Sequence, residues 1–101
     1  MSIRLGDCIR IVLTGRWLRG HPERNEVMDA HVIDVRRHWA TVIFPCFEHW
    51  FALDVRFAAL RQQPGKDYTI DKSNVRHPSW KRRHIWETAC NEAEKNQGEG
   101  L

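Results

Sequence analysis

The 101-residue chain lacks any apolar run near the roughly 20 residues that a membrane-spanning helix needs. Its first residues carry no apolar core and no cleavage site of the kind found in a secretory signal peptide. Cysteine is scarce, and the three thiols of Cys8, Cys46 and Cys90 are odd in number and far apart. These absences argue against a disulfide framework, and we expect a cytoplasmic protein that does not enter a membrane.

The motifs of catalysis and of metal binding are also missing. The chain has no phosphate-binding glycine loop, no C-x-x-C pair and no pair of carboxylates at a fixed spacing. Cys46 and His49 form one loose pair, whereas a structural zinc site usually needs two close pairs. We therefore predict no catalytic residue, no metal and no cofactor, and a function in binding rather than in chemistry.

What the chain does contain is a series of short alternating or β-branched segments separated by turn residues, which is typical of β-strands. A helical FAALR segment, suited to one 3₁₀ turn, follows the fourth of them. The segments predict a mainly β fold with five strands, at residues 8–14, 27–35, 39–44, 50–57 and 67–71.

The period of the sequence changes near His77, where Pro78 suits the first turn of a helix. We therefore predict a small five-stranded β-barrel over residues 1–71. Residues 72–101 are expected to form a basic linker and a C-terminal α-helix with an acidic tail. The charges of this helix run against its macrodipole, because its first turns are basic and its last turns acidic.

The layout resembles the small Src homology 3-like barrel, including KOW-type modules, over about residues 5–71. The cues are a Gly6-Asp7 entry, a long loop containing Trp17, a hairpin over residues 27–44 and an apolar segment ending at Leu60-Arg61. The resemblance implies binding of nucleic acid, chromatin or peptides without choosing among them.

A plasmid-borne dihydrofolate reductase family of similar layout shares the Gly6-Asp7 opening and the Ala58-Ala59-Leu60 turn. That family lines its pore with Val-Gln-Ile-Tyr, whereas this chain has Ala-Leu-Asp-Val at residues 52–55. The reductase interpretation is therefore rejected.

The segment from residue 72 to residue 86 is the main candidate site. It holds five cationic side chains, two histidines and two tryptophans without an acid, whereas residues 1–64 have nine arginines against seven acids. Cations can contact phosphates and tryptophans can stack on bases, so the segment is typical of a nucleic-acid or partner-binding surface. The candidate residues are Lys72, Arg76, Trp80, Lys81, Arg82, Arg83 and Trp86. Alternatively, Trp80 and Ile85 pack the helix on the barrel and the charges are merely solvated.

A second candidate is an aromatic platform made of Trp17, Trp39 and Trp50. If the third and fourth strands pair, Trp39 and Trp50 lie on the face opposite Phe44 and Phe51. Such a platform could receive a base, a peptide or a cationic group. The alternative, slightly favoured, is that the C-terminal helix covers this face and the tryptophans form a second core layer.

Two functions follow from these residues. The first is a nucleic-acid-associated accessory or regulatory protein that binds DNA or RNA through the basic segment. The second is a small protein-binding inhibitor or adaptor, of the phage or mobile-element type, that blocks or redirects a larger host protein machine. A weaker third expectation is a homodimer formed through an exposed barrel edge.

Overall fold

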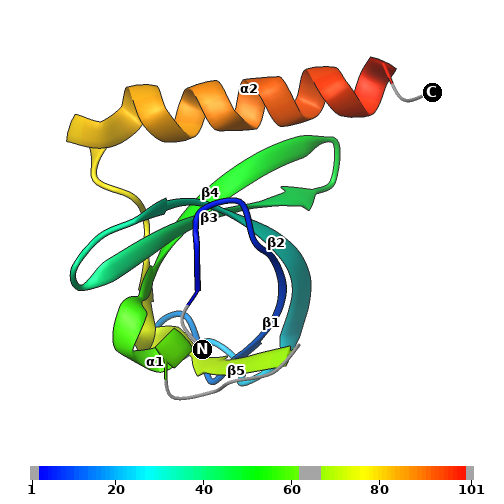
Figure 1. Cartoon of the computed structure of the whole chain (residues 1–101). Coiled ribbons are helices and arrows are strands. Elements are labelled where there is room, and N and C mark those ends of the chain that lie inside the picture. The colour runs from blue at the N-terminus through cyan, green and yellow to red at the C-terminus, as the bar shows by residue number, and fades with distance from the viewer. Residues whose placement is uncertain (1–2, 62–66, 100–101) are drawn as a thin grey trace.

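The computed structural model describes residues 3–61 and 67–99, and it folds into one curled six-stranded sheet with a helix lying outside it (Figure 1). The sheet order is β5-β1-β2-β3-β4-β6. The strands are β1 (Cys8–Thr14), β2 (Glu26–Val35), β3 (Trp39–Cys46), β4 (His49–Arg56), β5 (Asp67–Asp71) and β6 (Val75–Arg76). The helices are α1 (Phe57–Arg61), η1 (Lys72–Asn74), η2 (Trp80–Arg82) and α2 (Arg83–Glu99).

Strands β1 to β4 pair antiparallel in chain order, and β5 pairs parallel with β1 at the far edge. The single turn of η1 then carries the chain directly from β5 to β6, which pairs antiparallel with β4 at the opposite edge. Because three residues of η1 connect the two edge strands, the sheet curls until its edges approach each other (Figure 1).

The mainly β class and the C-terminal helix are confirmed, but the number of strands is six and not five. The additional strand, β6, lies in the segment predicted to be a linker, and its two residues are too few for a period to be visible in the sequence. The FAALR segment forms a short α-helix rather than a 3₁₀ turn. The loop expected at residues 62–66 lies outside the described residues.

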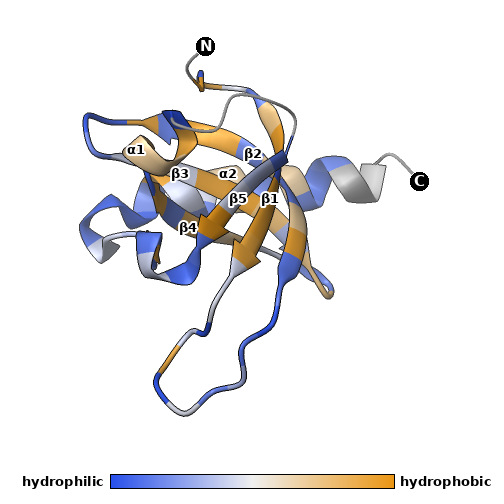
Figure 2. Cartoon of the chain, turned by 90° about the horizontal axis from the view of Figure 1, so that it is seen from below, coloured by the Kyte–Doolittle hydropathy of each residue, from blue (hydrophilic) through white to orange (hydrophobic). Residues whose placement is uncertain are grey.

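The main core fills the inside of the curl. Alternate residues of β1, β2, β3 and β4 point inward, and Leu60 of α1 is fully buried among them. The view in Figure 2 shows the apolar strands and, in contrast, the polar β1–β2 loop extending away from the barrel. The largest fully buried apolar side chains are Ile11, Leu13, Val32, Val42, Val55, Leu60 and Ile70.

Helix α2 packs across the outer face of β3 and β4 (Figure 1). A second, smaller cluster joins them: Cys90 of α2 contacts Ile43 and Ala52, and Trp50 and Trp86 pack around these residues. The register between β2 and β3 shifts between Val32 and Asp34, which leaves Val32 in the main core while the following residues reach the outer face. No helix within the described residues is long and apolar enough to cross a membrane.

Candidate functional site

A polar row crosses the outer face of the sheet beside the start of α2. Asp34 of β2 is opposite Thr41 of β3, Thr41 is opposite Asp54 of β4, and Asp54 is opposite Arg76 of β6. Paired residues of neighbouring strands project to the same face, so these four side chains lie side by side. The row therefore places two carboxylates, a hydroxyl and a guanidinium side by side on the outer face of the sheet.

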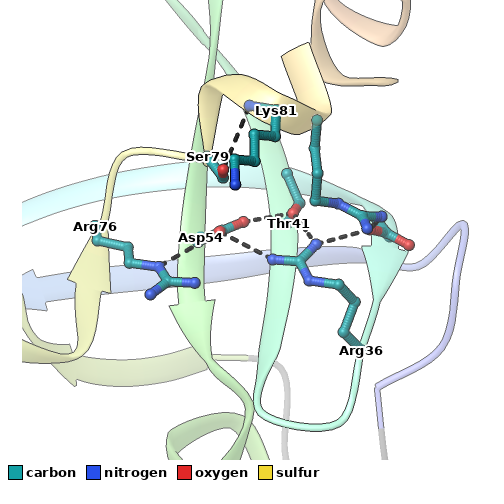
Figure 3. Close-up of polar contacts among 8 residues, drawn as sticks. Arg36, Thr41, Asp54, Arg76, Ser79 and Lys81 are labelled. Carbon is teal, nitrogen blue, oxygen red and sulfur yellow. Dashed lines mark hydrogen bonds and ion pairs between the residues drawn. The ribbon is translucent and has the colours of Figure 1, made fainter. Parts of the chain in front are cut away.

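Asp54 is the centre of this row, with a side chain only 1% exposed (Figure 3). Its Oδ2 accepts a hydrogen bond from Arg36 Nη2 at 2.9 Å and lies 3.6 Å from Arg76 Nε, and its Oδ1 accepts from the Thr41 hydroxyl. A buried carboxylate is costly unless it is paired and hydrogen-bonded. The contacts to two guanidinium groups satisfy that requirement and fix the positions of Arg36 and Arg76.

Arg36 connects Asp54 to the second acid of the row. Its Nη1 donates to Asp34 Oδ2 at 2.7 Å and to Thr41 Oγ1 at 2.9 Å. Burial alone would lower the pKa of Arg36, but the hydrogen bonds and charges of Asp34 and Asp54 outweigh it and raise the pKa. Arg36 therefore stays cationic and holds the two carboxylates together.

Trp39 lies next to this network on the same face, and two guanidinium groups contact its ring. The centre of the Arg76 guanidinium is 3.7 Å from the Trp39 ring centroid, and that of Arg56 is 4.8 Å away. Arg56 is opposite Trp39 in the β3–β4 register, so the strand pairing itself creates the contact. Cations at these distances are attracted to the negative face of an indole ring.

The chain leaves β6 and enters η2 beside this stack. Ser79 caps η2 by accepting a hydrogen bond from the backbone N–H of Lys81 at 3.3 Å (Figure 3). Trp80 projects into solvent with 76% of its surface exposed, and Lys81 is also exposed. Arg82 forms an ion pair with Asp34, which ties η2 to the polar row.

Arg83 completes this surface, since it begins α2 and pairs with Glu87 one turn later at 2.6 Å. We call the whole surface the arginine–tryptophan face. It consists of Trp39, Arg56, Arg76, Trp80, Lys81, Arg82 and Arg83.

Lys72 is placed elsewhere. Its side chain is 1% exposed, and its ammonium forms an ion pair with Glu26 at 3.0 Å and donates to the carbonyl oxygens of Arg24 at 2.9 Å and Gly15 at 3.3 Å. The ring of Trp17 covers it, with 5.1 Å between Nζ and the ring centroid. Lys72 therefore ties the β1–β2 loop to η1, and its ammonium does not face solvent.

The three tryptophans of the expected platform have separate surroundings. Trp17 belongs to the β1–β2 loop, where its Nε1 donates to Glu26 at 2.9 Å. Trp39 contacts two arginines, whereas Trp50 packs under α2 and near His31, with 5.6 Å between ring centroids. Trp86 belongs to the same cluster under α2. Only Trp39 and Trp80 therefore join the cations on the arginine–tryptophan face.

Sequence reasoning did not identify Arg36, Thr41, Asp54 and Arg56 as site residues. Asp54 gave a signal, because an acid stands between the apolar residues Leu53 and Val55. The other members have unremarkable sequence neighbours, and only the strand register places them in one row.

The potential metal ligands and thiols form no comparable site. Among residues 3–61 and 67–99, no three side chains of His, Cys, Asp or Glu gather closely enough to hold a metal ion. Burial, with the charges of Glu94 and Glu87, raises the pKa of the Cys90 thiol, so Cys90 is kept protonated under α2. No family model, curated protein or solved structure matches the chain.

Proposed function

We propose that the protein is a nucleic-acid-associated accessory or regulatory protein that binds DNA or RNA through the arginine–tryptophan face. The observation that supports this most directly is the contact of Arg56 and Arg76 with the Trp39 ring, together with the exposed Trp80 and Lys81 at η2. Such a face offers cations for phosphates and the exposed Trp80 ring for a base.

The charge balance of this face favours an anionic ligand. Its cations outnumber its carboxylates, and each of Asp34, Asp54 and Glu87 is already paired with an arginine. The N-terminus of α2 adds a partial positive charge at Lys81 and Arg82, where an acid would stabilise the helix better. The side chains at this end are therefore explained by a negatively charged ligand more readily than by the stability of the helix.

The scaffold of this proposal is a barrel of the Src homology 3-like or KOW-like kind, working in the cytoplasm. The small curled sheet with a covering helix is consistent with it. In such a scaffold the strands fix Trp39, Arg56 and Arg76, and η2 presents Trp80 at the rim. No catalytic residue, metal or cofactor is required for this function.

The alternative is a small protein-binding inhibitor or adaptor, of the phage or mobile-element type, that blocks or redirects a larger protein machine. Tryptophan and arginine dominate the residues that carry binding energy at protein interfaces, so the same face could meet a protein. The exposed Trp80 is the specific observation in its favour, because an indole in a protein pocket loses its contact with water completely.

Fluorescence anisotropy with labelled single- and double-stranded DNA and RNA at several salt concentrations tests the first proposal. We expect micromolar or tighter binding that weakens steeply with salt. The double variant Lys81→Ala/Arg83→Ala should reduce the slope of log K against log salt by about 1.5, since each lost phosphate contact contributes roughly 0.7–0.9. The matched control is Arg10→Ala/Arg16→Ala, which removes two exposed arginines from β1 and the β1–β2 loop.

If the two double variants give equal slopes of log K against log salt, Lys81 and Arg83 do not contact phosphates. The start of α2 is then not part of the binding surface. Absence of binding at low salt would exclude the nucleic-acid proposal altogether. The protein-binding alternative would then be tested by Trp80→Ala, which should abolish partner binding and leave the melting temperature unchanged because the side chain is exposed.

A further inference from the structure

The turn between β3 and β4 carries an unusual residue. Phe47 is 99% exposed and has a backbone φ of 57°, in the left-handed region. Glycine and asparagine are the ordinary residues of such hairpin turns, and a bulky side chain there is strained. Phe47 thus costs free energy both through its backbone and through its exposed ring, which points to a function for the ring.

The β3–β4 hairpin that carries Phe47 also carries exposed apolar and acidic side chains. Phe51 is 46% exposed and lies against Phe44, with 6.3 Å between ring centroids. Glu48 is exposed, and Glu94 of α2 reaches the hairpin, where it accepts from the Trp50 backbone N–H at 2.9 Å. We call this surface the acidic tip, and it consists of Phe47, Glu48, Phe51 and Glu94.

The arginine–tryptophan face has the opposite character at the other end of α2. Phe47 and Trp80 are the two most exposed large apolar side chains of the described residues. In the chain, Trp80 is followed by Lys81, Arg82 and Arg83, whereas Phe47 is followed by Glu48. The 17 residues of α2 span about 25 Å, and the hairpin lies near the C-terminal end of this helix (Figure 1). The two aromatic groups therefore cannot meet within one molecule.

We propose that the acidic tip of one molecule docks on the Trp80 end of the arginine–tryptophan face of a second copy. An exposed Phe beside an acid complements an exposed Trp beside basic residues, because both side chains are apolar and the charges next to them have opposite signs. The two surfaces differ and lie at opposite ends of α2, so the contact between copies is heterologous. Such a contact adds copies head to tail and does not close as a two-fold dimer. The occupant of the acidic tip is thus a second copy of this chain.

Sedimentation velocity of the purified chain over a wide concentration range tests this contact. The weight-average sedimentation coefficient of the wild type should rise with concentration, and the rise should diminish at high salt because the contact is charged. Phe47→Gly and Trp80→Ala should each shift self-association to at least tenfold higher concentration.

Mixing the two variants gives the sharpest test. Phe47→Gly retains an intact Trp80, and Trp80→Ala retains an intact Phe47, so one productive contact can form between them. The mixture should contain a one-to-one complex that does not grow further. Thermal melts control for folding: glycine is suited to the positive φ of residue 47, so Phe47→Gly should melt no lower than the wild type.

Three results would each overturn the proposal. The first is a wild type that stays monomeric at the highest concentration. The second is self-association that either variant leaves unchanged. The third is a wild-type species that stops at two copies, because it would indicate a two-fold contact. None of these results depends on nucleic-acid binding, so this contact and the proposed function can fail separately.

Discussion

Asp54 is a buried carboxylate with three polar partners. Its carboxylate is buried on the outer face of the sheet, where two arginines balance its charge and a threonine hydroxyl donates a hydrogen bond to it. Arg36 in turn holds Asp34, to which Arg82 is also paired. One carboxylate therefore organises the cations of the arginine–tryptophan face.

Asp54→Ala should lower the free energy of unfolding by about 3–5 kcal/mol, because it leaves the half-buried Arg36 without one of its two carboxylate partners. Urea unfolding monitored by circular dichroism measures this change. The control is Asp29→Ala, which breaks the exposed pair with Arg10 and should alter stability little. A loss for Asp54→Ala as small as the one expected for Asp29→Ala would mean that the Asp54 network does not stabilise the fold.

At the scale of elements, the β1–β2 loop depends on one ion pair under Trp17. Burial raises the pKa of Glu26, but the hydrogen bonds of Lys72 and Trp17 and the charges of Lys72 and Arg24 outweigh it, so the pKa lies below its ordinary value of 4.5. The unfolded chain therefore binds the proton first as the pH falls. Glu26 stabilises the fold above about pH 4.5, and this contribution is lost as the pH falls through its lowered pKa.

Glu26→Gln should therefore reduce stability at pH 7 and differ less and less from the wild type as the pH drops below about 4.5. Urea unfolding at a series of pH values measures the difference. Glu23→Gln is the matched control, since Glu23 is an exposed acid of the same loop paired with Arg16. A constant difference between Glu26→Gln and the wild type down to pH 3 would contradict the role assigned to the charge of Glu26.

The elements also show how much of the fold could be predicted from the sequence alone. Alternating or β-branched apolar segments predicted the approximate positions of β1 to β5. β6 was not predicted because it shows no apolar pattern of its own. It is a strand only through its pairing with β4. The same limit applies to Lys72, whose position in a basic segment suggested exposure although its ammonium is buried under Trp17.

The whole molecule is polarised along α2, with the arginine–tryptophan face at one end and the acidic tip at the other. The net charge of +3 conceals this separation. Both proposals use Trp80, one for stacking on a base and the other for contact with a second copy. Nucleic acid and a second copy should therefore exclude each other at this residue.

A saturating single-stranded oligonucleotide should accordingly dissociate the head-to-tail species into protein monomers bound to nucleic acid. Sedimentation velocity with a labelled oligonucleotide follows both components at once. Phe47→Gly, which cannot supply the acidic tip, should bind the oligonucleotide as tightly as the wild type or more tightly. Oligomers that persist on the oligonucleotide would show that the two contacts do not share Trp80.

The sequence by itself determined the mainly β class, the order of the main strands and the C-terminal helix, because these depend on local patterns of apolar residues. It also located the basic, tryptophan-containing segment. Only the tertiary structure decided which of those cations face solvent, since Lys72 is buried and Arg82 is paired with Asp34. The stack around Trp39 likewise arises from strand register, which joins residues far apart in the chain and leaves no local trace in the sequence.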